Sequence, residues 1–255
     1  MKFHKYSSTG NDFIILNHNE EFVTELPSAD WIKKICKRRV SVGADGLILV
    51  KKTGENAVKM TYYNSDGNEV EMCGNGLRAV ARYCHEELKL SNNHPIQVHT
   101  KNAKYDVLVP NYLNIKIKMT EIDTSCLTAA SSYDADFVTV GVPHVVKEYR
   151  DISNFPLDLA KEIRADFIFS EGTNVNFYTE LSSGNLRVRT FERGVESETL
   201  SCGTGVTATA FIYMKKAGVH KVSIQTEGGQ LIVSKVGEDI FLEGPSELVF
   251  KGELS

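Results

Sequence analysis

Long apolar segments are missing from this sequence. No stretch approaches the roughly 18 apolar residues that a membrane-spanning helix needs, and residues 1–10 contain no hydrophobic core of a secretion signal. An excess of one charge is also missing: 29 Lys and Arg face 33 Asp and Glu, without long like-charge runs, for a formal net charge of -4. A basic patch for nucleic acid or an anionic membrane is therefore not expected. These absences predict a cytoplasmic protein with neither a membrane nor a nucleic-acid partner.

Cysteine is scarce and is not arranged for disulfides or metal. The chain has 5 cysteines, an odd number, with no Cys-x-x-Cys pair and no histidines clustered beside them. This pattern disfavours a secreted disulfide framework and a structural zinc site, so no metal is expected. Buried, inert thiols are the ordinary interpretation for Cys36, Cys84 and Cys126. Cys73 and Cys202 stand in a different context.

The sequence around these two cysteines is repeated. Cys73-Gly74-Asn75-Gly76 and Cys202-Gly203-Thr204-Gly205 are 129 positions apart. At the same offset further identities follow on both sides, namely Glu69 with Glu198, Ala79 with Ala208 and Ala81 with Ala210. We interpret this as an internal duplication that presents one cysteine at a helix N-terminus in each half. The alternative is a single domain with an accidental Cys-Gly-x-Gly repeat.

A helix-compatible run follows each copy. In the first run, apolar residues from Leu77 to Leu88 form one stripe, and Arg78 falls on one of the remaining faces. The second, about 206–217, is apolar on several faces, which predicts a helix covered by sheet on most sides; Gly218 fits the position after its end. Further helices are expected at 28–38 and 156–165. A strand is expected over 136–142, ending at Pro143-His144.

Strands greatly outnumber helices in this pattern, which predicts an α+β fold. We expect two pseudo-symmetric domains, each a curved mixed β-sheet around a central helix, with the active site in the cleft between them. Residues 1–120 would carry Cys73 and residues 121–245 would carry Cys202. Another expected strand spans 113–119, and a C-terminal strand, about 246–255, would return to the first domain.

A cysteine followed by glycines at a helix N-terminus has specific chemistry. The first backbone N–H groups of a helix have no intrahelical partner and carry partial positive charge, so they bind a carboxylate and favour a thiolate. One copy would suit a cysteine hydrolase or a thiol redox enzyme. Two copies suit a two-base racemase, in which one thiolate removes a proton next to a carboxylate and the opposite thiol returns one to the other face.

The motifs resemble those of the diaminopimelate epimerase family over nearly the whole chain. The segments that carry the resemblance are Gly10-Asn11-Asp12-Phe13, Gly43-Ala44-Asp45-Gly46-Leu47, Tyr63-Asn64-Ser65-Asp66-Gly67, Glu71-Met72-Cys73-Gly74-Asn75-Gly76, Pro143-His144, Gly172-Thr173-Asn174-Val175-Asn176-Phe177, Glu192-Arg193-Gly194 and residues 198–205. Proline and hydroxyproline racemases share the fold and the cysteine pair, but usually have His where this chain has Asn75. Phenazine-pathway isomerases share the fold without that pair.

The resemblance implies cofactor-independent interconversion of LL- and meso-diaminopimelate, in lysine and peptidoglycan-precursor synthesis. Cys73 and Cys202 would be the acid/base thiols, and the reacting carboxylate would be held by backbone N–H groups. The implied substrate-binding residues are Asn11, Asn64, Gly74, Asn75, Asn174, Glu192, Arg193, Gly203 and Thr204, with His144 as an auxiliary residue. No cofactor and no metal are implied. The partner would be the small-molecule substrate, and a homodimer is a further expectation.

Several simpler interpretations stay open. The cysteines could be structural thiols, His144 an ordinary strand-end histidine, Asn11 and Asn64 turn formers, and Glu192-Arg193 an exposed ion pair. Asp45 is expected only to stabilise its turn. The chain departs from the family at Val142, where some members have Asn, and by one extra residue within 195–197. Other functions to be weighed are another amino-acid racemase, a non-catalytic amino-acid-binding protein and a thiol redox protein.

Overall fold

The computed structural model describes residues 1–21, 26–70, 73–90, 93–111 and 114–254. By contacts the chain divides into two units, Met1–Ile117 with Gly244–Ser255, and Lys118–Glu243. The domain boundaries predicted from the sequence, 1–120 and 121–245, stay a prediction. The motif residues Glu71 and Met72 lie outside the described residues, as do the ends of two expected strands, at 113 and 255.

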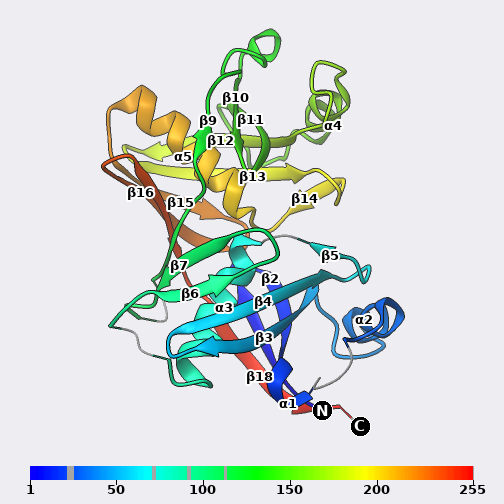
Figure 1. Ribbon diagram of the computed structural model, residues 1–255. Coiled ribbons are helices and arrows are strands. Elements are labelled where there is room, and N and C mark those ends of the chain that lie inside the picture. Colours follow the sequence, from blue (N-terminus) through cyan, green and yellow to red (C-terminus); the bar gives the residue numbers. More distant parts are fainter. Residues whose placement is uncertain (22–25, 71–72, 91–92, 112–113, 255) are drawn as a thin grey trace. The chain divides into compact units, whose positions relative to one another are not determined.

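The first unit is a mixed sheet with helices on it (Figure 1). Its elements are β1 (Lys2–Ser8), β2 (Asn11–Asn17), α1 (His18–Glu21), α2 (Ala29–Cys36), β3 (Gly46–Gly54), β4 (Ala57–Asn64), β5 (Glu69–Val70), α3 (Gly74–Glu86), β6 (Ile96–His99), β7 (Lys104–Leu108), β8 (Ile115–Lys118) and β18 (Glu247–Glu253). β1 pairs antiparallel with β2 and β18, so the C-terminal strand belongs to this unit. β2 is parallel to β3, β3 and β5 are antiparallel to β4, and β4 is parallel to β6. β7 then pairs antiparallel with both β6 and β8.

The second unit repeats this scheme. Its elements are β9 (Ile122–Asp123), the 3-10 helix η1 (Ser131–Tyr133), β10 (Asp136–Val140), β11 (Val142–Glu148), α4 (Leu157–Ala165), β12 (Asn174–Ser182), β13 (Asn185–Glu192), β14 (Ser197–Thr199), α5 (Gly203–Ala217), β15 (Lys221–Thr226), β16 (Gly229–Val236) and β17 (Asp239–Gly244). β10 to β17 pair with the same directions as β1 to β8, including the parallel pairs β11·β12 and β13·β15. β9 adds antiparallel to β10, as β18 does to β1. The predicted α+β fold with two repeated domains is confirmed.

A central helix packs on the strands of each unit. α3 contacts β1, β2, β3, β6 and β7, and α5 contacts β10 to β13, β15 and β16. Residues Val206 to Ala210 of α5 are all buried, and Gly218 ends the helix with left-handed backbone angles. A helix covered on most sides by sheet, as its sequence predicts, is therefore confirmed.

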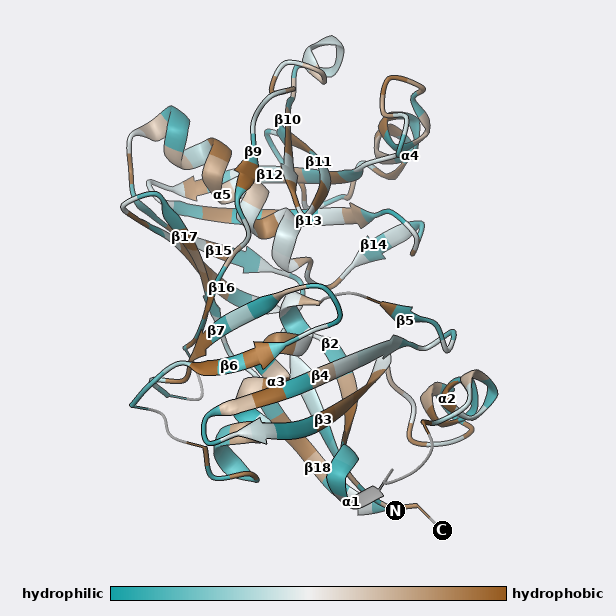
Figure 2. Cartoon of the chain, in the orientation of Figure 1, coloured by the Kyte–Doolittle hydropathy of each residue, from teal (hydrophilic) through white to brown (hydrophobic). Residues whose placement is uncertain are grey.

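Two further helices, α2 and α4, are shorter than the central helices and contact strands of their own units, β3 for α2 and β12 and β13 for α4. α2 begins after Ser28, whose side chain accepts a hydrogen bond from the Trp31 N–H at 3.3 Å. It buries Ile32, Ile35 and Cys36. Figure 2 shows both hydrophobic (brown) and hydrophilic (teal) residues along this helix. Both predicted helices, at 28–38 and 156–165, exist as α2 and α4 with slightly shorter bounds.

The strand predicted over 136–142 is wrong in its extent. Gly141 has a positive φ of 69 and reverses the chain, so that β10 and β11 form a hairpin. Pro143 and His144 therefore lie inside β11 rather than after a strand. Pro143 is tolerated there because it sits near the start of its strand. The consequence for the site is that His144 is held in the middle of a sheet.

Candidate active site

Each repeated cysteine is the residue that precedes a helix. Cys73 is the N-cap of α3 with φ -141 and ψ 118, and Cys202 is the N-cap of α5 with φ -116 and ψ 110. Their carbonyl oxygens accept matching first-turn hydrogen bonds, Leu77 N to Cys73 O and Val206 N to Cys202 O, both at 2.9 Å. Neither side chain caps its helix. Each cysteine therefore stands at a helix N-terminus whose first N–H groups its own side chain does not cap.

The glycines differ in how tightly they are enclosed. A Cβ on Gly205 would lie 2.2 Å from Asn176 Oδ1, whereas one on Gly76 would lie 3.0 Å from Cε of Met60. At Gly74 nothing would be within 4 Å. The α5 copy thus packs its first turn directly on a polar side chain, and the α3 copy packs against flexible apolar groups.

In the first unit, Cys73 belongs to a small polar network. The Cys73 thiol donates to Asn11 Oδ1 at 3.6 Å, and Asn75 Nδ2 donates to the same oxygen at 3.3 Å. Asn11 Nδ2 donates to Asp45 Oδ2 at 2.9 Å. Asp45 therefore fixes the orientation of the Asn11 amide, so that its oxygen faces Cys73. The expectation that Asp45 only stabilises its turn is too narrow.

Arg78, which the sequence places outside the apolar stripe of α3, is buried under this network. Its side chain is 0% exposed. Nη2 donates to Thr9 Oγ1 at 2.9 Å and to Asn75 Oδ1 at 3.0 Å, and Nε donates to the Pro245 carbonyl at 3.2 Å. Long helical side chains turn back toward the helix N-terminus, which brings the guanidinium beneath the first turn. Burial lowers the pKa of Arg78 to about 10.

Asn64, the remaining predicted residue of the first unit, ends β4. Its backbone N–H donates to Asn68 O at 3.0 Å, and its carbonyl accepts from Gly67 N–H at 2.9 Å. These bonds form the turn that leads to β5. The backbone of Asn64 therefore forms a turn, as the simpler interpretation of this residue expects. Its side chain is half-buried and takes no part in these two turn bonds.

In the second unit, Cys202 is 7% exposed and lies next to a hydroxyl. Its Sγ is 3.5 Å from Thr204 Oγ1, in a contact where either atom can donate. A thiolate at this position would accept the hydroxyl proton, and a thiol would donate its own. Thr204 thus supplies a hydroxyl that fits both protonation states of the sulfur.

His144 lies at the centre of a buried polar cluster. Nδ1 is 3.2 Å from Asn176 Nδ2, and Asn176 Oδ1 accepts from Thr190 Oγ1 at 2.9 Å. Burial lowers the pKa of His144 from 6.5 to about 3, and the positive charge of Arg193 adds to this effect. The imidazole is therefore neutral throughout the physiological pH range.

The other predicted residues of this unit meet at the end of β13. Asn174 Oδ1 accepts the backbone N–H of Arg193 at 2.7 Å, and Arg193 Nη1 donates to the Glu171 carbonyl. Glu192 is half-buried and is the last residue of β13. The extra residue expected within 195–197 would fall at the turn between β13 and β14, where Glu196 has a positive φ of 56. A salt bridge of 2.8 Å from Glu196 to Arg164 holds this turn.

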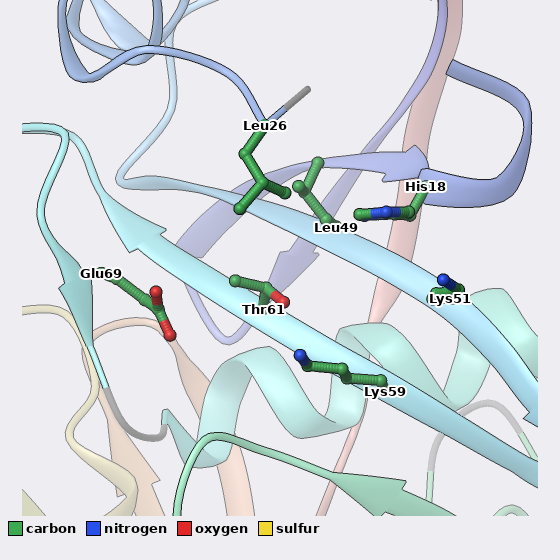
Figure 3. A pocket seen from close by; sticks show the side chains of 7 residues that line it. All are labelled: His18, Leu26, Leu49, Lys51, Lys59, Thr61 and Glu69. Atoms are coloured by element: carbon green, nitrogen blue, oxygen red, sulfur yellow. The ribbon is translucent and has the colours of Figure 1, made fainter. Parts of the chain in front are cut away.

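The first unit also has a surface cavity that holds none of the predicted residues. It measures about 290 Å³ and lies on β3 and β4 (Figure 3). Its lining consists of His18, Leu26, Leu49, Lys51, Lys59, Thr61 and Glu69. Over the described ranges, no helix is long and apolar enough to cross a membrane, and no three His, Cys, Asp or Glu side chains gather as metal ligands would.

Four residues in the hydrogen-bond networks around the predicted residues were not themselves predicted as site residues. They are Thr9, Arg78, Thr190 and Asn176, the last quoted only as part of a motif. Each is buried and polar. Strand pairing and helix packing bring Thr9, Thr190 and Asn176 to partners that are distant in sequence, whereas Arg78 also contacts Asn75 on its own helix. Burial of polar groups in a strand otherwise made of apolar residues, as at Asn174 and Asn176, is the one local signal that could have indicated them.

The fold and these contacts define a class: α+β proteins of two repeated units, each with a Cys-Gly-x-Gly motif at the start of its central helix. The diaminopimelate epimerase family model matches residues 3–122 and 137–249. The chain is 37% identical to the diaminopimelate epimerase of Methanocella arvoryzae, over 100% of this chain and 96% of that protein. It is 36% identical to that of Aquifex aeolicus, over 100% and 98%. The chain belongs to the diaminopimelate epimerase family.

Solved structures share the fold at low sequence identity. A PhzC/PhzF protein from Clostridium difficile superposes with a TM-score of 0.70 at 15% identity, covering 100% of this chain and 99% of that one. A hydroxyproline epimerase from Agrobacterium vitis, solved with bound trans-4-hydroxy-L-proline, gives 0.67 at 13%, covering 99% and 91%. These likenesses concern the fold.

Proposed function

We propose that this protein is an isomerase that interconverts LL- and meso-2,6-diaminopimelate by proton transfer at the α-carbon, in lysine and peptidoglycan-precursor synthesis. The observation that carries the proposal is the matched position of Cys73 and Cys202, each at the N-cap of a long helix, in a chain of this family. The reaction needs two groups that can exchange a proton from opposite faces of one carbon, and two thiols in equivalent settings are suited to it.

The reacting carboxylate would bind to the helix N-termini. Backbone N–H groups of Gly74, Asn75, Gly203 and Thr204 have no partners within their helices and carry partial positive charge. In our proposal one thiolate takes the α-proton, which leaves its electron pair on the carbon, and the other thiol gives its proton to the opposite face. Fixed N–H dipoles stabilise the carbanion-like transition state. The reverse reaction exchanges the two roles.

The distal end of the substrate would be held by amides and by a cation. Asn11, Asn64 and Asn174 offer donors and acceptors for a zwitterion, and Arg193 would pair with the distal carboxylate. The contact from Asn174 Oδ1 to the Arg193 backbone supports this grouping, because it holds the two residues together at 2.7 Å. Glu192 and His144 would lie near the reacting amino group.

A deuterium-exchange experiment tests the reaction. Reduced protein is incubated with LL-diaminopimelate in deuterium oxide, and the α-proton signal and the meso isomer are followed by NMR. We expect loss of the α-proton signal together with formation of the meso isomer. A folded protein that binds the substrate, shown by calorimetry, but gives neither signal would instead be a non-catalytic binder.

A substrate panel separates this reaction from related racemisations. Proline, hydroxyproline and single-ended amino acids lack the second charged end for which Arg193 and the asparagines are suited. We expect exchange with diaminopimelate and exchange slower by roughly 10⁴-fold with the others, the discrimination typical of a site whose polar groups an analogue leaves unpaired. Equal rates would assign the protein to another racemase class.

Location and assembly form part of the same proposal. All 5 cysteines lie in the described residues and none is in a disulfide, which suits a reducing cytoplasm.

We propose a homodimer because β18 exposes two large apolar side chains, Val249 at 56% and Phe250 at 45%. Light scattering on the purified protein tests this, with twice the mass of the chain as the expected result.

A further inference from the structure

The side-chain amide of Asn176 can take only one orientation. It is fully buried on β12, which runs parallel to β11 with Val146 opposite Asn176. Nδ2 donates to the Val145 carbonyl at 2.8 Å, and Oδ1 accepts from the Thr190 hydroxyl at 2.9 Å. Rotating the amide by half a turn would set its oxygen against the Val145 oxygen. The second hydrogen of Nδ2 therefore goes to His144 Nδ1, 3.2 Å away.

This bond determines which nitrogen of His144 carries the proton. A neutral imidazole has one donor and one acceptor nitrogen, and Nδ1 is the acceptor here. The proton is therefore on Nε2. That nitrogen is also buried, and the part of the chain that the structure describes offers it no hydrogen-bond partner. A buried N–H without a partner costs free energy, and such groups in native proteins commonly have a functional reason.

The same amide contacts the helix turn that carries Cys202. A side chain at Gly205 would collide with Asn176 Oδ1 and would approach Thr190 Oγ1 to 3.2 Å. Gly205 is the third residue of α5, and Cys202 is its N-cap. Asn176 thus connects the imidazole of His144 with the first turn of the cysteine helix.

We propose that Asn176 is a positioning residue that fixes His144 as a neutral imidazole with its proton on Nε2, so that His144 donates a hydrogen bond to an anionic group at the reacting centre. The inference rests on the proposed function for the identity of that centre. It excludes His144 as a general base, because its Nδ1 is held by a donor and its Nε2 is protonated. Asn176 on β12, which contacts His144, and Thr190 on β13, which contacts Asn176, are neutral, and Arg193 is the charged residue that acts on His144.

The tautomer is directly measurable in the wild-type protein. Protein labelled with ¹⁵N-histidine gives distinct nitrogen shifts and long-range couplings for the two tautomers and for imidazolium. We expect His144 to show the Nε2–H pattern, unchanged from pH 8 to pH 5. A spectrum with the proton on Nδ1, or a titration near pH 6.5, overturns the proposal without any variant. His144→Gln assigns the signal.

Two variants test whether Asn176 is the cause. Asn176→Asp replaces the donor by an acceptor at the same place, so we expect the proton to move to Nδ1 or the ring to become charged. Asn176→Leu removes the donor. Asn185→Asp, on the exposed start of β13, is the matched control and should leave the His144 spectrum unchanged. An unchanged tautomer in folded Asn176→Asp overturns the positioning role.

Kinetics distinguish positioning from a purely structural role. Loss of a donor to developing charge typically lowers kcat by about 100-fold, so we expect a fall of at least roughly tenfold in kcat for Asn176→Asp, with a smaller change in KM. Wild-type kcat in a variant with an altered tautomer would overturn the proposal. Failure of the wild-type protein to epimerise diaminopimelate would refute the proposed function alone, because the tautomer is measured without substrate.

Discussion

Cys73 and Cys202, which are 129 positions apart in the sequence, occupy the same position in two equivalent strand–helix arrangements. Each follows a short hairpin strand, β5 or β14, and each is the N-cap of the helix that packs on its unit's sheet. Their surroundings differ. Cys73 donates to an amide oxygen, while Cys202 lies beside a hydroxyl. The duplication has kept the backbone and the sulfur and has changed the side chains that contact the sulfur.

The first prediction concerns the cysteines. Cys73→Ala and Cys202→Ala should each lower the rate of α-proton exchange and the rate of epimerisation by about a thousandfold or more. The reason is that acid–base catalysis by a positioned group commonly contributes a factor of 10²–10⁴ to the rate. Binding of diaminopimelate, followed by calorimetry, should survive. Cys126→Ala is the matched control, since Cys126 is exposed; the buried position expected for it from the sequence is wrong. Retention of epimerisation by either active-site variant would exclude a two-thiol reaction.

A second prediction uses the matched glycines of the repeat. Gly205→Ala would force a Cβ to 2.2 Å from Asn176 Oδ1, so it should lower the free energy of unfolding by roughly 2–3 kcal/mol, as overpacking and a broken buried hydrogen bond do. Gly76→Ala meets the flexible end of Met60 at 3.0 Å and gains helix propensity. It should change stability by about 1 kcal/mol at most. Urea denaturation compares the two, and equal losses would contradict the packing asymmetry.

Stability should depend on pH through His144. Its pKa is lowered by burial from 6.5 to about 3, so between these values the unfolded chain binds a proton that the folded protein does not. Stability is therefore lost as pH falls below about 6.5. The loss attributable to His144 should be roughly 3 kcal/mol between pH 7 and pH 4.5, at 1.36 kcal/mol per pKa unit.

The comparison of wild type with His144→Gln isolates this effect. The variant should show a shallower decline of unfolding free energy between pH 7 and pH 4.5, whatever its stability at pH 7. Asp12 does not interfere in that window. Burial opposes its ionisation, but Arg38 and Lys5 lower its pKa from 3.8 to about 2, so its contribution is lost only below about pH 3.8. Identical slopes in the two proteins would show that His144 is accessible to protons when folded.

Asp45 should act on the reaction through Asn11. Asp45→Asn weakens the acceptor that holds Asn11 Nδ2 at 2.9 Å, so the Asn11 amide can rotate away from Cys73. We expect a fall of about tenfold in kcat/KM, the size of one lost charge-assisted hydrogen bond. Asp66→Asn is the control, because Asp66 holds only the exposed turn at Asn68. Equal kinetics in both variants would show that Asp45 has only a structural role.

Local patterns predicted the repeat and the helices, because a glycine-rich turn before an apolar run is a local property of the chain. They failed where tertiary contacts decide. Periodicity placed Arg78 outside the apolar stripe but could not show its burial, because its acceptors on Thr9, Asn75 and Pro245 come from three segments. His144 was placed after a strand because proline usually ends one. Its partner Asn176 is 32 positions away, and only the parallel pairing of β11 with β12 brings them together.

Arg78 provides the last prediction, because it is a buried cation that no carboxylate pairs with in the described part of the chain. Three hydrogen bonds, to Thr9, Asn75 and Pro245, hold it. Arg78→Met leaves these acceptors buried without their donor, so the free energy of unfolding should fall by about 3 kcal/mol or more. Arg187→Met is the control: its partly exposed ion pair with Glu227 should contribute about 0–1 kcal/mol. Because Asn75 loses the bond that orients its amide toward Asn11, folded Arg78→Met should also lose activity, whereas Arg187→Met should not. Equal stability of the two variants, measured by urea denaturation, would show that the buried guanidinium contributes no more than a surface ion pair.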